Sequence, residues 1–177
     1  VDETGKVSVE DVKAALQEDT ILVTIMYGNN EVGTIQSIAE IGALLKDHQA
    51  VFHTDAVQAY GLIDLNVADL QVDLLSVSAH KLNGPKGIGF LYAKQGTKLH
   101  PLLVGGSQEK KRRAGTENIA STLGFAKAVE LATASREEKV AEYKKFKQLL
   151  IEQFEISGID FKVNGHKTDV LPHVLNV

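Results

Sequence analysis

Two residues of this chain, Lys81 and Asp55, could together do carbonyl chemistry. Lys81 ends an apolar segment and opens a turn rich in glycine and proline, and Asp55 closes an earlier apolar segment. A lysine amine can hold an aldehyde as a Schiff base. A buried aspartate can keep a pyridine nitrogen protonated, so that the ring accepts electrons. This is the pair of side chains that a pyridoxal phosphate enzyme requires.

Each of these residues also has an ordinary structural interpretation. A lysine after a strand is commonly a solvated loop residue, and an aspartate there commonly caps a helix or forms an Asx turn. Around Lys81, the donors of Ser78 and His80 and a run of glycines favour the functional interpretation, because glycines let the backbone pass close to a ligand. Gln58, three residues after Asp55, could hydrogen-bond the phenolic oxygen of the ring.

Three further polar positions each allow more than one interpretation. His53 alternates with Asp55 in an extended segment, so it is either a hydrogen-bonded core histidine or a second partner for the aspartate. Asn30 lies in a turn signal, or its amide reaches the ring oxygen or the substrate. The basic run at 110–113 is a solvated loop or a phosphate patch, and Thr116 after it could hold a phosphate at the start of a helix.

Composition excludes several other classes of protein. The chain has 177 residues, a formal net charge of -4, 44% apolar and 24% charged residues, which is ordinary for a globular domain with one core. It has no cysteine, which excludes disulfides and cysteine-based metal sites within these residues and fits a cytoplasmic location. The spacing of the histidines indicates no metal site. No apolar run is long enough to span a membrane, and nothing in the charge pattern indicates nucleic acid.

The first half of the chain alternates strands with helices. Helical spacing is found at 9–16, with Ser8 as the expected N-cap, and again at 37–48. Strands are predicted at 20–26, 50–54, 70–77 and 87–93, and the first of these, a continuous β-branched run, is typical of a strand buried on both faces. This order predicts an α/β fold with a mostly parallel sheet. Asn30, Asp55 and Lys81 each follow a strand, at the edge where such sheets bind ligands.

The second half is different in character. A polar loop at 102–116 precedes a helical region at 117–154, with a break expected near 133–136. A single apolar stripe on a charged helix, followed by a strand predicted at 161–163, suggests a second domain. We therefore expect a partial cofactor-binding domain at 1–138 and the beginning of a smaller domain at 139–177. Because the chain lacks an initiator methionine and stops inside an apolar segment, we expect a fragment of a longer protein.

Four ordered motifs resemble those of the cysteine desulfurases of the class-V aminotransferase family, which includes enzymes of nitrogen fixation and iron–sulfur cluster assembly. The motifs are Asn-Asn-Glu-Val-Gly at 29–33, His-Thr-Asp-Ala-Val-Gln at 53–58, Ser-Ala-His-Lys at 78–81 with Gly-Pro-Lys-Gly at 84–87, and Gly-Gly-x-Gln-Glu-x-x-x-Arg-Ala-Gly-Thr at 105–116. Together they are far more specific than any one alone. The resemblance implies a fold-type I large domain, the start of a smaller α+β domain, and a homodimer.

The resemblance also implies a role for each candidate residue. Lys81 would carry pyridoxal phosphate and later shuttle protons, with His80 as the second catalytic residue. Asp55 would pair with the ring nitrogen, while Gln58 and Asn30 would contact the ring oxygen.

The phosphate and the substrate complete these implied roles. Ser78 and His80 would hold the cofactor's phosphate, and Thr116 would reach the phosphate of the partner subunit's cofactor. The implied reaction converts L-cysteine to alanine and leaves a persulfide on an enzyme cysteine, for delivery to an iron–sulfur scaffold or a sulfur carrier. The family's persulfide-forming cysteine is expected downstream of this chain, so we expect the chain alone to be inactive. The alternatives are selenocysteine lyase, another class-V enzyme, or a cofactor-free module for dimerisation or scaffold binding.

Overall fold

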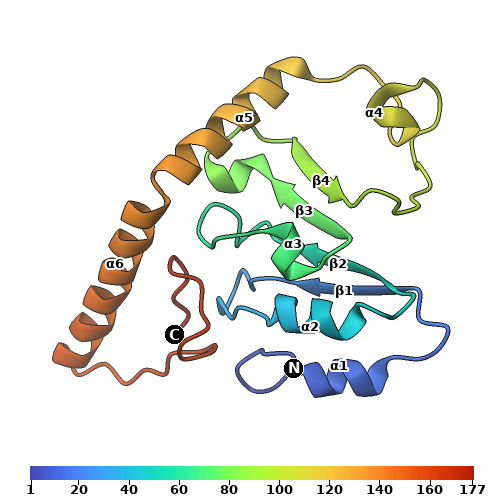
Figure 1. Ribbon diagram of the computed structural model, residues 1–177. Helices are drawn as coiled ribbons and strands as arrows, with labels where there is room; N and C mark the ends of the chain where they lie inside the picture. Colours follow the sequence, from blue (N-terminus) through green and yellow to red (C-terminus); the bar gives the residue numbers. More distant parts are fainter.

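A four-stranded mixed sheet occupies the centre of the molecule, in a computed structural model that describes residues 1–177 (Figure 1). The strands lie in the order β1-β2-β3-β4. Strands β1, β2 and β3 are parallel, and β4 runs antiparallel to β3. Their bounds are Leu22–Met26 for β1, Val51–Asp55 for β2, Leu74–Ser78 for β3 and Gly89–Ala93 for β4. The prediction of an α/β fold with a mostly parallel sheet is therefore confirmed.

Helices connect the strands and form the second half of the chain. Their bounds are Val9–Ala15 for α1, Ile38–Leu45 for α2, Val67–Leu70 for α3, Ala79–Leu82 for the 3-10 helix η1, Gln108–Lys111 for α4, Ile119–Ala134 for α5 and Arg136–Ile156 for α6. Ser8 caps α1 as predicted, since its hydroxyl accepts a hydrogen bond from the backbone N–H of Asp11 at 3.2 Å. The predicted break in the long helical region falls at Ser135. None of these helices is long and apolar enough to cross a membrane.

The core lies where α2 covers the middle of the sheet. Ile38 and Ile41 of α2 are fully buried in one apolar cluster with Phe52 of β2 and Leu75 of β3. The helices pack so closely that a Cβ at Gly42 would lie 2.2 Å from the carbonyl oxygen of Leu70 in α3. The same cluster continues to η1 and α5, so the core holds η1 in place behind the strand ends.

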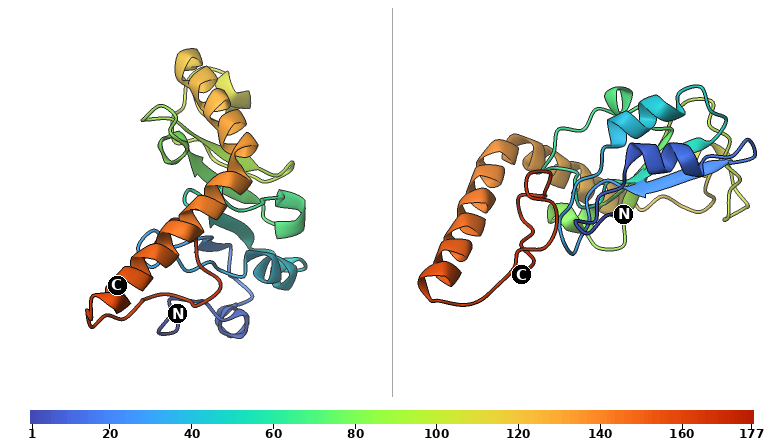
Figure 2. Two further views of the ribbon diagram at one scale, coloured as in Figure 1. Left: turned by 90° about the vertical axis from the view of Figure 1, so that its left-hand side faces the viewer. Right: turned by 90° about the horizontal axis from the view of Figure 1, so that it is seen from below.

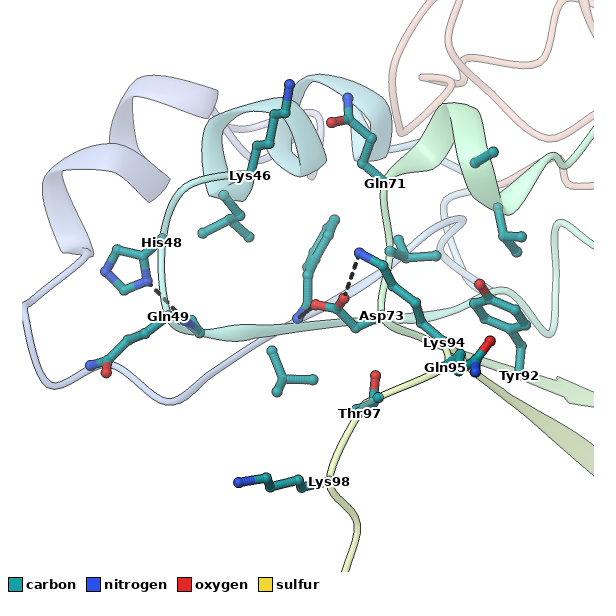
Figure 3. A pocket seen from close by; sticks show the side chains of 18 residues that line it. Lys46, His48, Gln49, Gln71, Asp73, Tyr92, Lys94, Gln95, Thr97 and Lys98 are labelled. Carbon is teal, nitrogen blue, oxygen red and sulfur yellow. Dashed lines mark hydrogen bonds and ion pairs between the residues drawn. The ribbon is translucent and has the colours of Figure 1, made fainter.

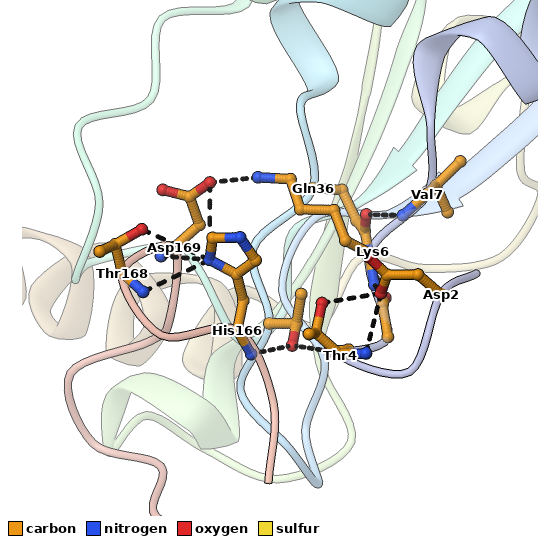
Figure 4. A network of polar contacts seen from close by, with 10 residues as sticks. Asp2, Thr4, Lys6, Val7, Gln36, His166, Thr168 and Asp169 are labelled. Carbon is orange, nitrogen blue, oxygen red and sulfur yellow. Dashed lines mark hydrogen bonds and ion pairs between the residues drawn. The ribbon is translucent and has the colours of Figure 1, made fainter.

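A polar network ties the N-terminal residues to the C-terminal segment (Figure 4). The fully buried Thr34 hydroxyl donates to the carbonyl of Thr4 at 2.5 Å and accepts from the backbone N–H of His166 at 3.1 Å. Lys6 forms an ion pair with Asp169 across the same junction. These contacts fix the C-terminal segment, which has no regular secondary structure, against the edge of the sheet domain.

Two sequence predictions are wrong. Strand β1 is not buried on both faces, because Leu22 keeps 51% of its surface exposed at the outer edge of the sheet. No strand forms at 161–163, where the chain has no neighbouring strand to pair with and Phe161 instead packs its ring against Phe154 at 5.3 Å between centroids. The sequence also gave no indication of α3 or of α4, which lies inside the predicted loop at 102–116.

Candidate active site

The carboxyl ends of three parallel strands bring the predicted residues to one edge of the sheet. Asp55 is the last residue of β2, and Ser78 is the last residue of β3. Asn30 follows the end of β1, where the Tyr27 N–H donates to the Asp55 carbonyl at 2.8 Å. Because parallel strands end at the same edge, these groups belong to one side of the molecule, as the sequence predicted.

Lys81 lies in η1, directly after β3. The chain leaves η1 through Asn83, which takes a left-handed conformation with φ of 60°. Leu82 is buried and anchors η1 to the core, while the side chains of His80 and Lys81 face outward and are exposed. Lys81 forms no ion pair and no side-chain hydrogen bond within the chain, so its amine is available to a ligand.

A recess of about 220 Å³ lies beside Lys81. We call it the Lys81 recess. Its walls come from the β2–α3 connection, η1, α5, α6 and the C-terminal segment, and its polar lining residues are Gln58, Tyr60, His80, Lys81, Asn83, Lys139, Tyr143 and His173. The structure thus brings Gln58, His80 and Lys81 together. Asp55, Asn30, Ser78 and Thr116 are not among its lining residues.

Asp55 has one carboxylate oxygen engaged and one free. Its Oδ1 accepts a hydrogen bond from the backbone N–H of Val57 at 2.9 Å, and Oδ2 has no partner within the chain. The Asx turn that the sequence allowed as an ordinary interpretation is therefore present, and it still leaves an acceptor for a ligand.

His53 is a fully hydrogen-bonded histidine and not a partner of Asp55. Its Nδ1 is bonded to the Thr24 hydroxyl at 2.7 Å, and its Nε2 to the Ser76 hydroxyl at 2.8 Å. Burial lowers the pKa of His53 below 6.5, and the negative charge of Asp55 opposes this only in part. The neutral ring therefore joins three strands through a line of hydroxyls beneath the site.

The two asparagines after β1 differ in their roles. Asn29 forms the turn, because its Oδ1 accepts from the backbone N–H groups of Glu31 and Val32 at 2.8 and 2.9 Å. Asn30 is exposed, and its amide donates only to the Glu31 carboxylate at 2.6 Å. Asn30 is thus the one of the pair whose amide is free to turn toward a ligand.

Thr116 is exposed in the segment between α4 and α5, away from the Lys81 recess. The short helix α4 before it is strained, since Glu109, Lys110 and Lys111 all have positive φ. This segment extends beyond β4 in Figure 1. Within one chain, Thr116 has no place in the site.

The largest cavity lies elsewhere, at the opposite edge of the sheet. It measures about 790 Å³ and is lined by residues at the amino ends of β2 and β3 and after β4 (Figure 3). Its one carboxylate, Asp73, is already engaged by Lys94 at 3.3 Å and by the Phe52 N–H at 3.0 Å. The volume of a cavity therefore does not identify the candidate active site, because none of the predicted residues line this largest cavity.

Sequence reasoning missed five polar residues of the Lys81 recess. Two of them, Tyr60 and Asn83, lie close to the predicted residues in the chain. The other three are Lys139, Tyr143 and His173. Lys139 and Tyr143 belong to α6, and His173 belongs to the C-terminal segment. The sequence placed these residues in a separate domain, and His173 carried no motif. Only the path of the chain, which returns α6 and the C-terminal segment to η1, brings them to Lys81.

The groups at this edge fit pyridoxal phosphate in kind. Lys81 offers an unengaged amine, and Asp55 offers a free carboxylate oxygen for a pyridinium N–H. The amide of Gln58 and the hydroxyl of Ser78 also have no side-chain partner within the chain, so they remain available to a ring oxygen and a phosphate. This set contains an amine, an acid and neutral donors, which are the groups that such a cofactor needs.

The whole chain, residues 1–177, matches the family model for aminotransferase class-V. A protein of Bacillus subtilis (strain 168) named IscS 1 is 58% identical over 177 residues, which are 100% of this chain and 47% of that protein. The cysteine desulfurase IscS of Dictyoglomus turgidum is 47% identical over 99% of this chain and 45% of its own length. The chain thus spans about half the length of the curated relatives it matches.

Solved structures agree with these relatives. A NifS-like protein superimposes with a TM-score of 0.92 at 36% identity, over 99% of this chain and 48% of that one. The protein SspA in complex with cysteine superimposes with a TM-score of 0.70 at 42% identity, over 72% of this chain and 38% of that one.

Proposed function

Because the chain belongs to the class-V aminotransferase family, whose members generally use pyridoxal phosphate, we propose that it is the cofactor-anchoring part of a cysteine desulfurase. The observation that carries the proposal is the unengaged Lys81 amine, held directly after β3 at the sheet edge that also presents Asp55. The names of the relatives favour this reaction over a selenocysteine lyase or a cofactor-free module.

In this proposal each residue binds a different part of the cofactor. Lys81 Nζ would bind the aldehyde of the cofactor, and the same amine would move a proton to and from the substrate, with His80 beside it. Asp55 Oδ2 accepts the hydrogen bond of the ring N–H and keeps that nitrogen protonated. Gln58 and Asn30 donate to the ring oxygen. When bound, the cofactor supplies a ring that accepts the electron pair released from the substrate.

The phosphate needs further donors. Ser78 and His80 hold it from the end of β3 and from η1. Thr116 does not line the Lys81 recess of its own chain, so its proposed contact is with the phosphate of a partner subunit's cofactor in a homodimer. The cytoplasm, where the cofactor and free cysteine are both present, is the proposed location.

The proposed reaction is L-cysteine plus a thiol giving L-alanine plus a persulfide. The C–S bond of the substrate breaks, and an S–S bond forms to the attacking thiolate. The electron pair of the C–S bond stays with Cβ, which takes a proton, so no outside oxidant or reductant is needed. Since this chain has no cysteine, the accepting thiol must come from outside these residues, and we propose that the chain alone is inactive. An iron–sulfur scaffold or a sulfur carrier would receive the sulfur.

We also propose that residues 1–138 are part of the large domain and that a smaller domain begins near Lys139. Support comes from the break at Ser135, after which α6 leaves the sheet and extends to one side of the molecule (Figure 2).

Absorption spectroscopy tests the cofactor proposal directly. Adding pyridoxal phosphate to the purified chain should produce a band near about 400 nm, and reduction with borohydride should leave a pyridoxyl group on Lys81 in a peptide map. Lys81→Ala should lose both signals. Lys86→Ala is the matched control, because Lys86 is exposed in the turn that follows η1 and does not line the Lys81 recess. A pyridoxyl group on another lysine, or no band in the unaltered chain, would refute the proposal.

A further inference from the structure

The C-terminal segment is joined to the turn after β1 by backbone hydrogen bonds. The Ile35 N–H donates to the Asp169 carbonyl at 2.8 Å, and the Leu171 N–H donates to the Gly33 carbonyl at 2.8 Å. The side chain of Leu171 is fully buried at this contact. The segment therefore covers the turn that also carries Asn30.

His166 shapes the bend of this segment through one nitrogen of its ring (Figure 4). The backbone N–H of Asp169 donates to His166 Nδ1 at 3.0 Å, and that of Thr168 donates to the same nitrogen at 3.3 Å. A backbone N–H can only donate, so Nδ1 must keep its lone pair and the ring proton must be on Nε2. The bend therefore requires the neutral ring, in one of its two tautomers.

Three charged groups face the His166 ring. Asp169, in the same segment, has its Oδ2 at 3.9 Å from Nδ1. Asp2, in the N-terminal loop, lies close enough for its carboxyl to respond to a charge on the ring. Lys6, from the same loop, forms an ion pair with Asp169 Oδ2. Both carboxylates attract a positive charge on the ring, while Lys6 occupies one of them.

A second proton on the ring would reverse the role of His166 Nδ1. The protonated nitrogen is a donor, so it can no longer accept from the N–H groups of Thr168 and Asp169. It turns instead to a carboxylate, and the nearest one is Asp169 Oδ2. Because that oxygen already accepts from Lys6, two cations then compete for it. Protonation thus exchanges two backbone contacts for a contested ion pair.

We propose that His166, Asp169 and Lys6 form a pH-sensitive clasp, which holds the C-terminal segment against the turn after β1. The neutral ring closes the clasp, and the protonated ring opens it. Because His173 of the same segment lines the Lys81 recess, an open clasp also loosens one wall of that recess. The clasp does not depend on the proposed function, since it uses no cofactor and no substrate.

The carboxylates of the clasp do not gain protons in the same pH range as a histidine. The hydrogen bond and the charge of Lys6 hold the pKa of Asp169 below 3.8. Hydrogen bonds from Thr4 and Lys6 hold the pKa of Asp2 below 3.8 as well. A histidine changes its charge between about pH 5 and pH 8. A change of the clasp in that range therefore reports on His166 and not on its acidic neighbours.

Hydrogen exchange of backbone amides, followed by NMR, measures whether the clasp is closed. The amides of Leu171 and Ile35 are the reporters, because their hydrogen bonds join the segment to the turn without involving the His166 ring. Protection factors are compared at about pH 8 and about pH 5.5, since they remove the ordinary effect of pH on exchange. We expect both amides to lose protection about ten-fold at the lower pH, the usual effect of losing one to two hydrogen bonds.

The ¹⁵N signals of the His166 ring test the tautomer in the same samples. At about pH 8, Nδ1 should be the nitrogen without a proton, and both nitrogens should carry protons at the pH where the reporter amides lose protection. A neutral ring with its proton on Nδ1 would overturn the proposal, because that tautomer cannot accept the two N–H groups.

His166→Asn separates the effect of the proton from the loss of the contact. An asparagine carbonyl can accept from N–H groups two and three residues further on, and Asn29 Oδ1 does so with Glu31 and Val32 in this chain. Asparagine gains no proton in this range, so the variant should keep its protection at both pH values. His100→Asn is the matched control, because His100 is exposed and lies outside the clasp; it should lose protection as the unaltered chain does.

Lys6→Met tests the competition for Asp169. Without the ammonium group, the whole charge of Asp169 is available to the protonated ring, so the loss of protection should move to a higher pH. A move to lower pH, or no move, would overturn the role of Lys6.

The remaining outcomes decide the clasp as a whole. Protection of Leu171 and Ile35 that does not change with pH overturns it, and so does an equal change in His166→Asn. Protection that rises as the pH falls also overturns it, because the charged ring would then hold the segment more tightly than the neutral one.

Discussion

Replacing His53 with phenylalanine should destabilise the chain by about 2 kcal/mol near neutral pH. The ring keeps its approximate size, but the hydrogen bonds to the Thr24 and Ser76 hydroxyls, at 2.7 and 2.8 Å, are lost. Each such bond contributes about 1 kcal/mol to the free energy of unfolding. Because both hydroxyls lie on the partly open face of the sheet, water can take up some of the loss, which keeps the sum from being larger.

The same substitution should change the pH dependence of stability. The pKa of His53 is lowered in the folded chain, so the unfolded chain binds the proton more readily. Stability from the neutral ring is therefore present above 6.5 and is lost as the pH falls through the lowered folded pKa. The phenylalanine variant has no proton to bind there. Its deficit relative to the unaltered chain should thus shrink at lower pH.

Urea unfolding followed by circular dichroism, at a neutral and a mildly acidic pH, measures both effects. His100→Phe is the matched control, since His100 is exposed and has no hydrogen bond. A deficit of His53→Phe below about 0.5 kcal/mol would refute the role of the hydroxyl line. A loss of stability in His53→Phe that is the same at both pH values would refute the lowered pKa of His53 in the folded chain.

Two further predictions concern the packing that positions the site. Gly42→Ala should lower the melting temperature, because the new Cβ would lie 2.2 Å from the Leu70 carbonyl oxygen. Overpacking of this kind costs about 1–3 kcal/mol, which outweighs the gain of about 1 kcal/mol in helix propensity. A higher melting temperature would contradict this prediction. Thr34→Val should lower the free energy of unfolding in urea by about 1–3 kcal/mol, because the buried hydroxyl joins Thr4 to His166. Lys6→Met should lower it by less than about 1 kcal/mol, because the ion pair of Lys6 with Asp169 is partly exposed. Equal losses in the two variants would contradict this ranking.

The sequence predicted where the strands lie in the chain better than it predicted which strands lie next to one another in the sheet. The β-branched run before Tyr27 predicted β1 correctly, since local propensity acts on the strand itself. It could not show that β1 lies at the edge of the sheet, because the pairing partners of a parallel strand lie far away in the chain. The predicted strand at 161–163 failed for the same reason: its residues suit a strand, but no neighbouring strand is present.

Some residues of the candidate site could be predicted from the sequence, and others could not. Asp55 and Lys81 could be predicted to lie at one edge of the sheet, because each follows a parallel strand and the sheet type fixes where such ends lie. Lys139 and His173 could not, since they reach the Lys81 recess only through the direction in which α6 leaves α5. The sequence predicted the break that falls at Ser135, but it did not predict the direction that α6 takes after the break.

The antiparallel strand β4 has a consequence for the order of folding. Ser78 of β3 pairs with Gly89 of β4, only eleven residues further along, whereas the parallel pairs join Leu22 to Val51 and His53 to Leu74. Closing a shorter loop loses less chain entropy, so the β3–β4 hairpin should be the first part of the sheet to assemble during folding. The residue that would anchor the cofactor lies within that hairpin's connection. Lys81 is therefore built into the earliest-forming part of the sheet, and its partners from β1, β2 and α6 join it later.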